Sequence, residues 1–146
     1  MTYPVTLSES LAVVGVIDPD AYAAATDVLT EAIDMGDFSQ LIAILSVGDI
    51  EDTATVDFSI QQSATSGGSY TDITGKSADQ LVTANDDKQV VINLDSSEVG
   101  PEKPFVKVRL EVGTAAADAG VIVLGGDARY DPASDLDVDS VIQTIK

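Results

Sequence analysis

Apolar and polar side chains alternate along two segments of the chain, residues 53–61 and 105–113. Successive side chains of a β-strand point to opposite faces, so this alternation predicts strands with one buried and one solvated face. The side chains expected in the core are Ala54, Val56, Phe58 and Ile60 from the first segment, and Val106, Val108, Leu110 and Val112 from the second. Both segments are therefore expected to lie against a hydrophobic core.

Three further segments, residues 38–47, 89–94 and 120–124, are almost continuously apolar and rich in β-branched residues. Short apolar runs of this kind predict strands that are buried on both faces. Polar turns with glycine, aspartate and asparagine separate all of these segments, and no long helical pattern lies between them. The sequence therefore predicts an all-β fold, a single antiparallel β-sandwich or jelly-roll domain.

The two ends of the chain differ from its middle in pattern. Residues 1–30 have a mixed pattern with two prolines and are expected as a partly irregular N-terminal arm. Residues 31–126 carry the strand pattern and are expected as the sandwich core. Residues 127–146 are expected as a C-terminal tail, which must bury Val141, Ile142 and Ile145 on its own core or on a neighbouring subunit.

Charge limits the partners that this chain can bind. Its 146 residues hold 25 Asp and Glu against 7 Lys and Arg, a formal net charge of −18, and every basic residue lies after residue 75. Binding to nucleic-acid phosphates or to an anionic membrane needs clustered basic residues, so neither partner is expected. A solvated acidic surface or adaptation to a salty environment explains the excess, and 45% hydrophobic residues argue against disorder.

Residues that carry common chemistry are missing from the sequence. It has no Cys and no His, so a thiolate metal site, a Cys nucleophile or a Ser-His-Asp triad cannot be built, and we expect no enzyme and no cofactor. The spacing Asp135-x-Asp-x-Asp139 opens like an EF-hand loop, but Ser140 and Lys146 stand where that loop needs Gly and Glu. We expect no metal site, and acidic turns such as Asp86-Asp87 at most bind Ca²⁺ weakly.

Aromatic and basic side chains share one predicted strand face at Phe105, Lys107 and Arg109. This arrangement fits either a docking stripe for an acidic partner or a ladder that pairs with acidic residues on adjacent strands. Arg129 lies beside Tyr130 between two aspartates, where a structural ion pair is the simpler interpretation. Candidate partner contacts are these residues together with Tyr3, Pro4 and Val5 of the arm.

Three blocks of sequence occur in an order typical of one protein group: residues 32–38 (AIDMGDF) leading into Val47-Gly48, residues 70–75 (YTDITG), and residues 105–109 (FVKVR) followed by residues 125–130 (GGDARY) and Pro132. Residues 30–132 thereby resemble a widespread group of small tailed-bacteriophage head proteins, described as minor capsid, decoration or cement proteins.

The resemblance implies a structural virion protein that needs no catalytic residue. Its expected partner is the major capsid protein, whose shell it would bind on the outer surface and stabilise. A homotrimer, a place on the capsid exterior and residence in the host cytoplasm before assembly are also implied. The alternative is a phage head-fibre or tail-associated module that binds glycans, with Ca²⁺ held by the acidic turns.

Overall fold

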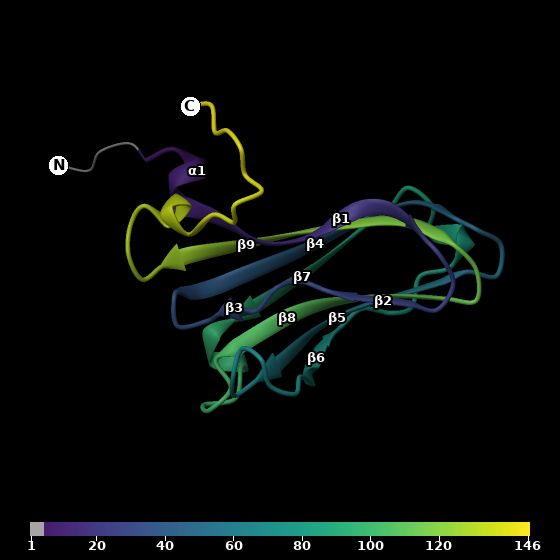
Figure 1. Ribbon diagram of the computed structural model, residues 1–146, viewed down its shortest axis with the longest axis horizontal. Helices are drawn as coiled ribbons and strands as arrows, with labels where there is room; N and C mark the ends of the chain where they lie inside the picture. The colour runs from purple at the N-terminus through teal and green to yellow at the C-terminus, as the bar shows by residue number, and fades with distance from the viewer. Residues whose placement is uncertain (1–4) are drawn as a thin grey trace.

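The computed structural model describes residues 5–146, which form two antiparallel β-sheets packed face to face (Figure 1). The strands are β1 (Leu11–Tyr22), β2 (Thr26–Leu29), β3 (Ile33–Asp34), β4 (Phe38–Ile50), β5 (Thr55–Ser63), β6 (Thr71–Ser77), β7 (Gln89–Asp95), β8 (Phe105–Gly113) and β9 (Ala117–Ala128). The short helical elements are α1 (Leu7–Ser10), η1 (Thr83–Asn85), η2 (Ser96–Glu98) and η3 (Ala133–Leu136).

The strand order is that of a jelly roll. One sheet has the order β1-β9-β4-β7 and the other has β2-β8-β5-β6, with β3 also paired to β8. Apart from the β5–β6 pair and the short β2–β3 step, each successive strand lies in the opposite sheet, which is how a jelly roll wraps its hairpins around one core. The prediction of an all-β, antiparallel sandwich is therefore confirmed.

The alternating segments bury the faces that the sequence predicts. Val56, Phe58 and Ile60 of β5 are inaccessible to solvent or nearly so. The same is true of three valines and one leucine of β8, which alternate with Lys107 and Arg109: Val106, Val108, Leu110 and Val112. These side chains meet the inward face of the other sheet, which supplies Leu45, Val121 and Val123 among others. Burial of this apolar surface is the main force that holds the sheets together.

The nearly continuous apolar segments are buried on one face only, so the expectation of burial on both faces is wrong. Along β4, Ala43 and Leu45 are buried while Ile44 between them is partly exposed. The same holds for Ile122 of β9, which lies between two buried valines. These strands form an outer layer of a two-layer fold, and no third layer of the described chain covers the far side of the sheet.

Part of the segment expected as an arm forms strands in the structure. Residues 11–22 pair with β9 as β1, and residues 26–29 pair with β8 as β2. The alternation of β1 is interrupted because its pairing shifts twice, between Val13 and Gly15 and between Ile17 and Asp20. Pro19 lies in the second shift, at the edge of the sheet where a missing backbone donor is tolerated.

The segments at both ends of the described chain lie together beside the four-stranded sheet (Figure 1). The backbone amide of Val138 donates to the carbonyl of Val13, and the Val13 amide donates to the Asp137 carboxylate. Ala133 of η3 is fully buried, so residues 133–138 pack against the edge strand β1. No helix within residues 5–146 has the length and apolar character needed to span a membrane.

Candidate functional site

Apolar side chains are aligned across the outer face of the four-stranded sheet. In one row, Val16 lies opposite Ile122, Ile122 opposite Ile44, and Ile44 opposite Val91, so the row crosses all four strands. In the next row, Val13 lies opposite Leu124 and Leu124 opposite Ile42. We call these residues the apolar sheet face: Val13, Val16, Ile42, Ile44, Val91, Ile122 and Leu124.

Two side chains of the apolar sheet face are open to solvent, one on the edge strand β7 and one on the inner strand β9. The side chains of Val91 and Ile122 are 52% and 50% exposed, respectively. Single exposed apolar side chains are common on soluble proteins, but a contiguous row of them marks a site of interaction. The row therefore makes this sheet face the strongest candidate for a binding surface on the described chain.

The outer face of the five-stranded sheet is polar, and its charges are satisfied within the sheet. Arg109 donates two hydrogen bonds of 2.8 Å to the Asp27 carboxylate and also lies 3.2 Å from Glu111. Hydrogen bonding to Arg109 lowers the pKa of Asp27, and the same contact raises the pKa of Arg109. The Lys107 ammonium lies 4.9 Å from the centre of the Tyr70 ring, within range of a cation–π contact.

The predicted contact residues fall into two groups in the structure. Phe105, Lys107 and Arg109 lie half-buried on β8, in the polar outer face of the five-stranded sheet, where Arg109 takes part in a cross-strand ladder. Arg129 and Tyr130 follow β9 at the opposite end of the molecule from the β8–β9 turn, and the Arg129 guanidinium lies 5.6 Å from the Tyr130 ring.

Val5 is near this second group. It lines an open depression with Asp127, Ala128, Asp131 and Pro132, the residues on both sides of Arg129 and Tyr130. Tyr3 and Pro4 lie outside the described residues. The structure thus brings Val5, Arg129 and Tyr130 to one end of the molecule and leaves the β8 residues on the other sheet.

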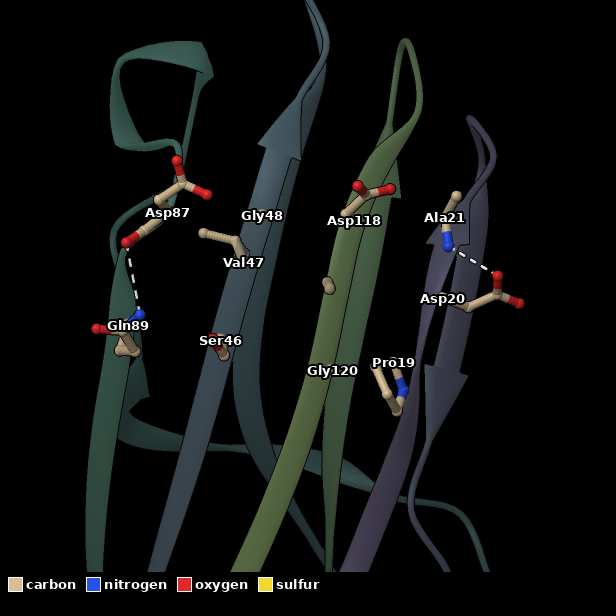
Figure 2. Close-up of a pocket in the computed structure, with 11 residues that line it drawn as sticks. Pro19, Asp20, Ala21, Ser46, Val47, Gly48, Asp87, Gln89, Asp118 and Gly120 are labelled. Carbon is tan, nitrogen blue, oxygen red and sulfur yellow. Dashed lines mark hydrogen bonds between the residues drawn. The ribbon is translucent and has the colours of Figure 1, made fainter.

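Acidic side chains gather at the other end of the apolar sheet face. An open depression there is lined by Asp20, Asp87 and Asp118 together with the backbone of β4 and β9 (Figure 2). Figure 2 shows Asp20 on β1, Asp118 on β9 and Asp87 in the turn before β7, with their carboxylates spread apart rather than directed at one point. Within residues 5–146, no three acidic side chains are grouped closely enough to hold a metal ion.

The terminal segments, residues 5–10 and 137–146, add apolar groups at the end opposite the acidic depression. Ile142 and Ile145 are 95% and 84% exposed, so the tail does not bury them on its own core. The Lys146 ammonium lies 2.6 Å from Glu9 and joins the two segments. Hydrogen bonds from Lys146 and Thr6 lower the pKa of Glu9 to about 2, so this ion pair persists in mildly acidic solution.

Four residues of the apolar sheet face were not predicted as partner contacts from the sequence: Val16, Ile44, Val91 and Ile122. Their signal was present, because each lies in or beside a run with apolar residues at consecutive positions. Such a run places apolar side chains on both faces of a strand. A covered core strand and an exposed binding face produce the same pattern, and only the arrangement of the sheets distinguishes them.

Comparison with known proteins gave distant likenesses only. No protein-family model matches the chain, and the search of curated proteins found no match. Among solved structures, a chain of infectious bursal disease virus, Gt strain, aligns with a TM-score of 0.46 at 9% identity, over 85% of this chain and 35% of that one. A chain of broad bean stain virus aligns with a TM-score of 0.42 at 11% identity, over 75% of this chain and 62% of that one. The present chain thus spans about a third of the length of the first of these proteins.

Proposed function

We propose that this protein is a structural component of a virion, a capsid decoration or cement protein that binds the outer surface of the major capsid protein shell and stabilises it. The observation that carries the proposal is the exposed apolar sheet face on a chain with a net charge of −18. The charge keeps free copies soluble, while the apolar face provides a surface to bury on a larger partner. The order of sequence blocks shared with tailed-phage head proteins supports the same function.

A cement protein needs a stable scaffold and a binding surface that fits the shell, and it needs no catalytic residue. A protein that bridges capsid subunits gains affinity from buried apolar area and stabilises the assembled shell because it binds that state preferentially. The described residues provide a rigid sandwich for this purpose, with long hydrogen-bonded strands β4 and β9 at its centre. In the proposal, the protein resides in the host cytoplasm before assembly, and three copies then form a homotrimer on the capsid exterior.

Reconstitution on shells tests the proposal. Expanded shells that lack the protein are prepared by deleting its gene from the phage, mixed with purified protein, and sedimented. We expect saturable, stoichiometric binding and a higher temperature of shell rupture, measured by light scattering and electron microscopy. Bovine serum albumin, which is also acidic, serves as the control. Failure of the wild-type protein to bind at micromolar concentration contradicts the proposal.

The alternative of a glycan-binding module gains no support from the acidic depression. Sugar sites commonly present an aromatic ring to the apolar face of the sugar, and none of the residues that line this depression is aromatic. A glycan array screened with and without a chelator separates the alternatives, because a glycan-binding module gives calcium-dependent signals and a cement protein gives none.

A further inference from the structure

We propose that the apolar sheet face is the surface that contacts the capsid shell, and that the shell presents there an apolar patch flanked by Lys or Arg side chains. The proposal deepens the proposed function and rests on it for the identity of the partner. It assigns the contact to the sheet β1-β9-β4-β7, away from Phe105, Lys107 and Arg109.

The geometry of the sheet supports a broad contact. The row Val16, Ile122, Ile44, Val91 runs perpendicular to the strands, and neighbouring strands lie about 4.8 Å apart, so the row extends over roughly 15 Å. The second row with Leu124 and Ile42 widens it along the strands. A surface of this kind accepts another apolar surface rather than a small molecule, which needs a concave pocket.

The charge around the face identifies the chemistry of the partner. Strand ends and turns at one end of the sheet carry these acidic residues: Asp18, Asp20, Asp49, Glu51, Asp52, Asp86, Asp87 and Asp118. One basic residue, Lys88, lies at the same end, so a strong acidic excess is left there. Complementary charges steer association and exclude wrong partners, so a partner on this face gains from basic residues opposite this end.

A second copy of the chain is a poor occupant of the face for the same reason. A symmetric dimer formed through this face would place the acidic strand ends of two chains near one interface. Lys88 is the basic residue at this end, while three others form ion pairs elsewhere on the chain: Lys76 with Glu98, Arg109 with Asp27 and Lys146 with Glu9. A basic-rimmed partner meets no such repulsion.

The terminal segments limit where the partner can sit. An open depression is lined by residues of the terminal segments (Leu7, Val141, Thr144) and of β1 and β9 (Leu11, Val13, Leu124). The terminal segments therefore lie beside the apolar sheet face, at the end away from the acidic turns (Figure 1). A partner on the face is therefore placed between the acidic turns and the exposed Ile142 and Ile145 of the tail.

The test combines substitutions on the face with matched controls. The double variant Val91→Thr with Ile122→Thr removes exposed apolar groups and keeps β-branched side chains suited to strands. Val82→Thr is the control, because Val82 is 44% exposed but precedes η1, outside the apolar sheet face. Binding of labelled protein to expanded shells is measured by sedimentation, with thermal unfolding to verify each fold. We expect at least tenfold weaker binding for the double variant and less than a twofold change for the control.

The charge component is tested separately by salt dependence. The triple variant Asp20→Asn, Asp87→Asn, Asp118→Asn is compared with Glu31→Gln, Asp79→Asn, Glu102→Gln, which removes the same charge from residues outside the acidic end and outside the terminal segments. We expect the first triple variant to bind more weakly at low salt and to lose much of its salt dependence, and the second to behave like wild type.

The outcomes separate this inference from the proposed function. If wild-type protein binds shells and the Val91→Thr, Ile122→Thr variant binds equally well, the surface is wrong and the cement function stands. If wild-type protein does not bind, both are wrong. If the free protein self-associates through this face, as shown by sedimentation equilibrium of wild type and double variant, a second copy is the occupant and the inference is overturned.

Discussion

Replacing Gly125 with alanine tests how tightly the sandwich core is packed around the ring of Phe38. Gly125 is a buried residue of β9, and the ring of Phe38 lies directly over it. A Cβ atom at this position would lie 2.7 Å from Cδ1 and 2.8 Å from Cε1 of that ring, whereas ordinary contacts are 3.4–4 Å. The ring therefore has to move by roughly 0.7–1 Å within a core that is packed as densely as a crystal.

The expected magnitude combines two opposing effects. Overpacking a well-filled core costs about 1–3 kcal/mol, while Gly→Ala recovers about 0.5–1 kcal/mol by restricting the unfolded chain. Taking the midpoint of each range, the net loss in the free energy of unfolding is about 1.2 kcal/mol. At about 2.1 cal/mol/K per residue, unfolding 146 residues has an entropy of about 0.3 kcal/mol/K, so Tm falls by about 4 °C.

Thermal unfolding followed by circular dichroism, together with urea titration, measures this loss. Gly67→Ala is the control, because a Cβ at Gly67 meets no atom within 4 Å, and its Tm is expected to stay within about 2 °C of wild type. Phe38→Leu in the Gly125→Ala background should relieve the clash, so the double variant is less destabilised than the sum of the single variants. A Gly125→Ala protein that melts at or above the wild-type temperature refutes the packing argument.

Three further predictions concern the core, the surface charges and the N-terminal region. Val56→Asp places an unpaired charge in the fully buried face of β5 and is expected to abolish folding, seen as loss of the β-sheet circular dichroism signal. Asp27→Asn weakens an exposed ion pair and costs less than about 1 kcal/mol at pH 7. Because Arg109 lowers the pKa of Asp27, this contribution is present above the ordinary aspartate pKa of about 3.9 and is lost as pH falls through the lowered pKa, so the Tm difference from wild type shrinks as the solution is acidified below about pH 4. Deleting residues 1–20 removes most of β1 and exposes the edge of β9, so the product is expected to be insoluble, whereas a chain that stays folded shows that β1 is dispensable.

Strands β5 and β8 of the five-stranded sheet were predictable because solvent covers their outer face. Asp57, Ser59 and Lys107 alternate with buried residues, so the period of two is visible in the sequence. Neighbouring positions differ in polarity because one side chain faces the core and the next faces water. The alternation therefore predicted the inward-facing residues of β5 and β8 correctly.

Strand β1 was not recognised because its position in the sheet alters its pattern. Two register shifts disturb the alternation, and the run Asp18-Pro19-Asp20 has the composition of a turn. At a sheet edge these residues are useful, since proline and charged side chains hinder pairing with another chain. Their role depends on β9 as a neighbour, a strand about a hundred residues later, which local sequence patterns do not reveal.

The misjudged strands β4, β7 and β9 are the strands that carry the apolar sheet face. Ile44, Val91 and Ile122 are partly or half exposed, although their sequence context predicts burial on both faces. Removing these apolar side chains from water would be favourable, but no other part of the described chain covers them. The exposed apolar row is not needed for folding, because the opposite faces of the same strands already form the core. Contact with another molecule is the explanation that we propose for the row, and such a contact would cover the second face of β4, β7 and β9, which the fold itself leaves open.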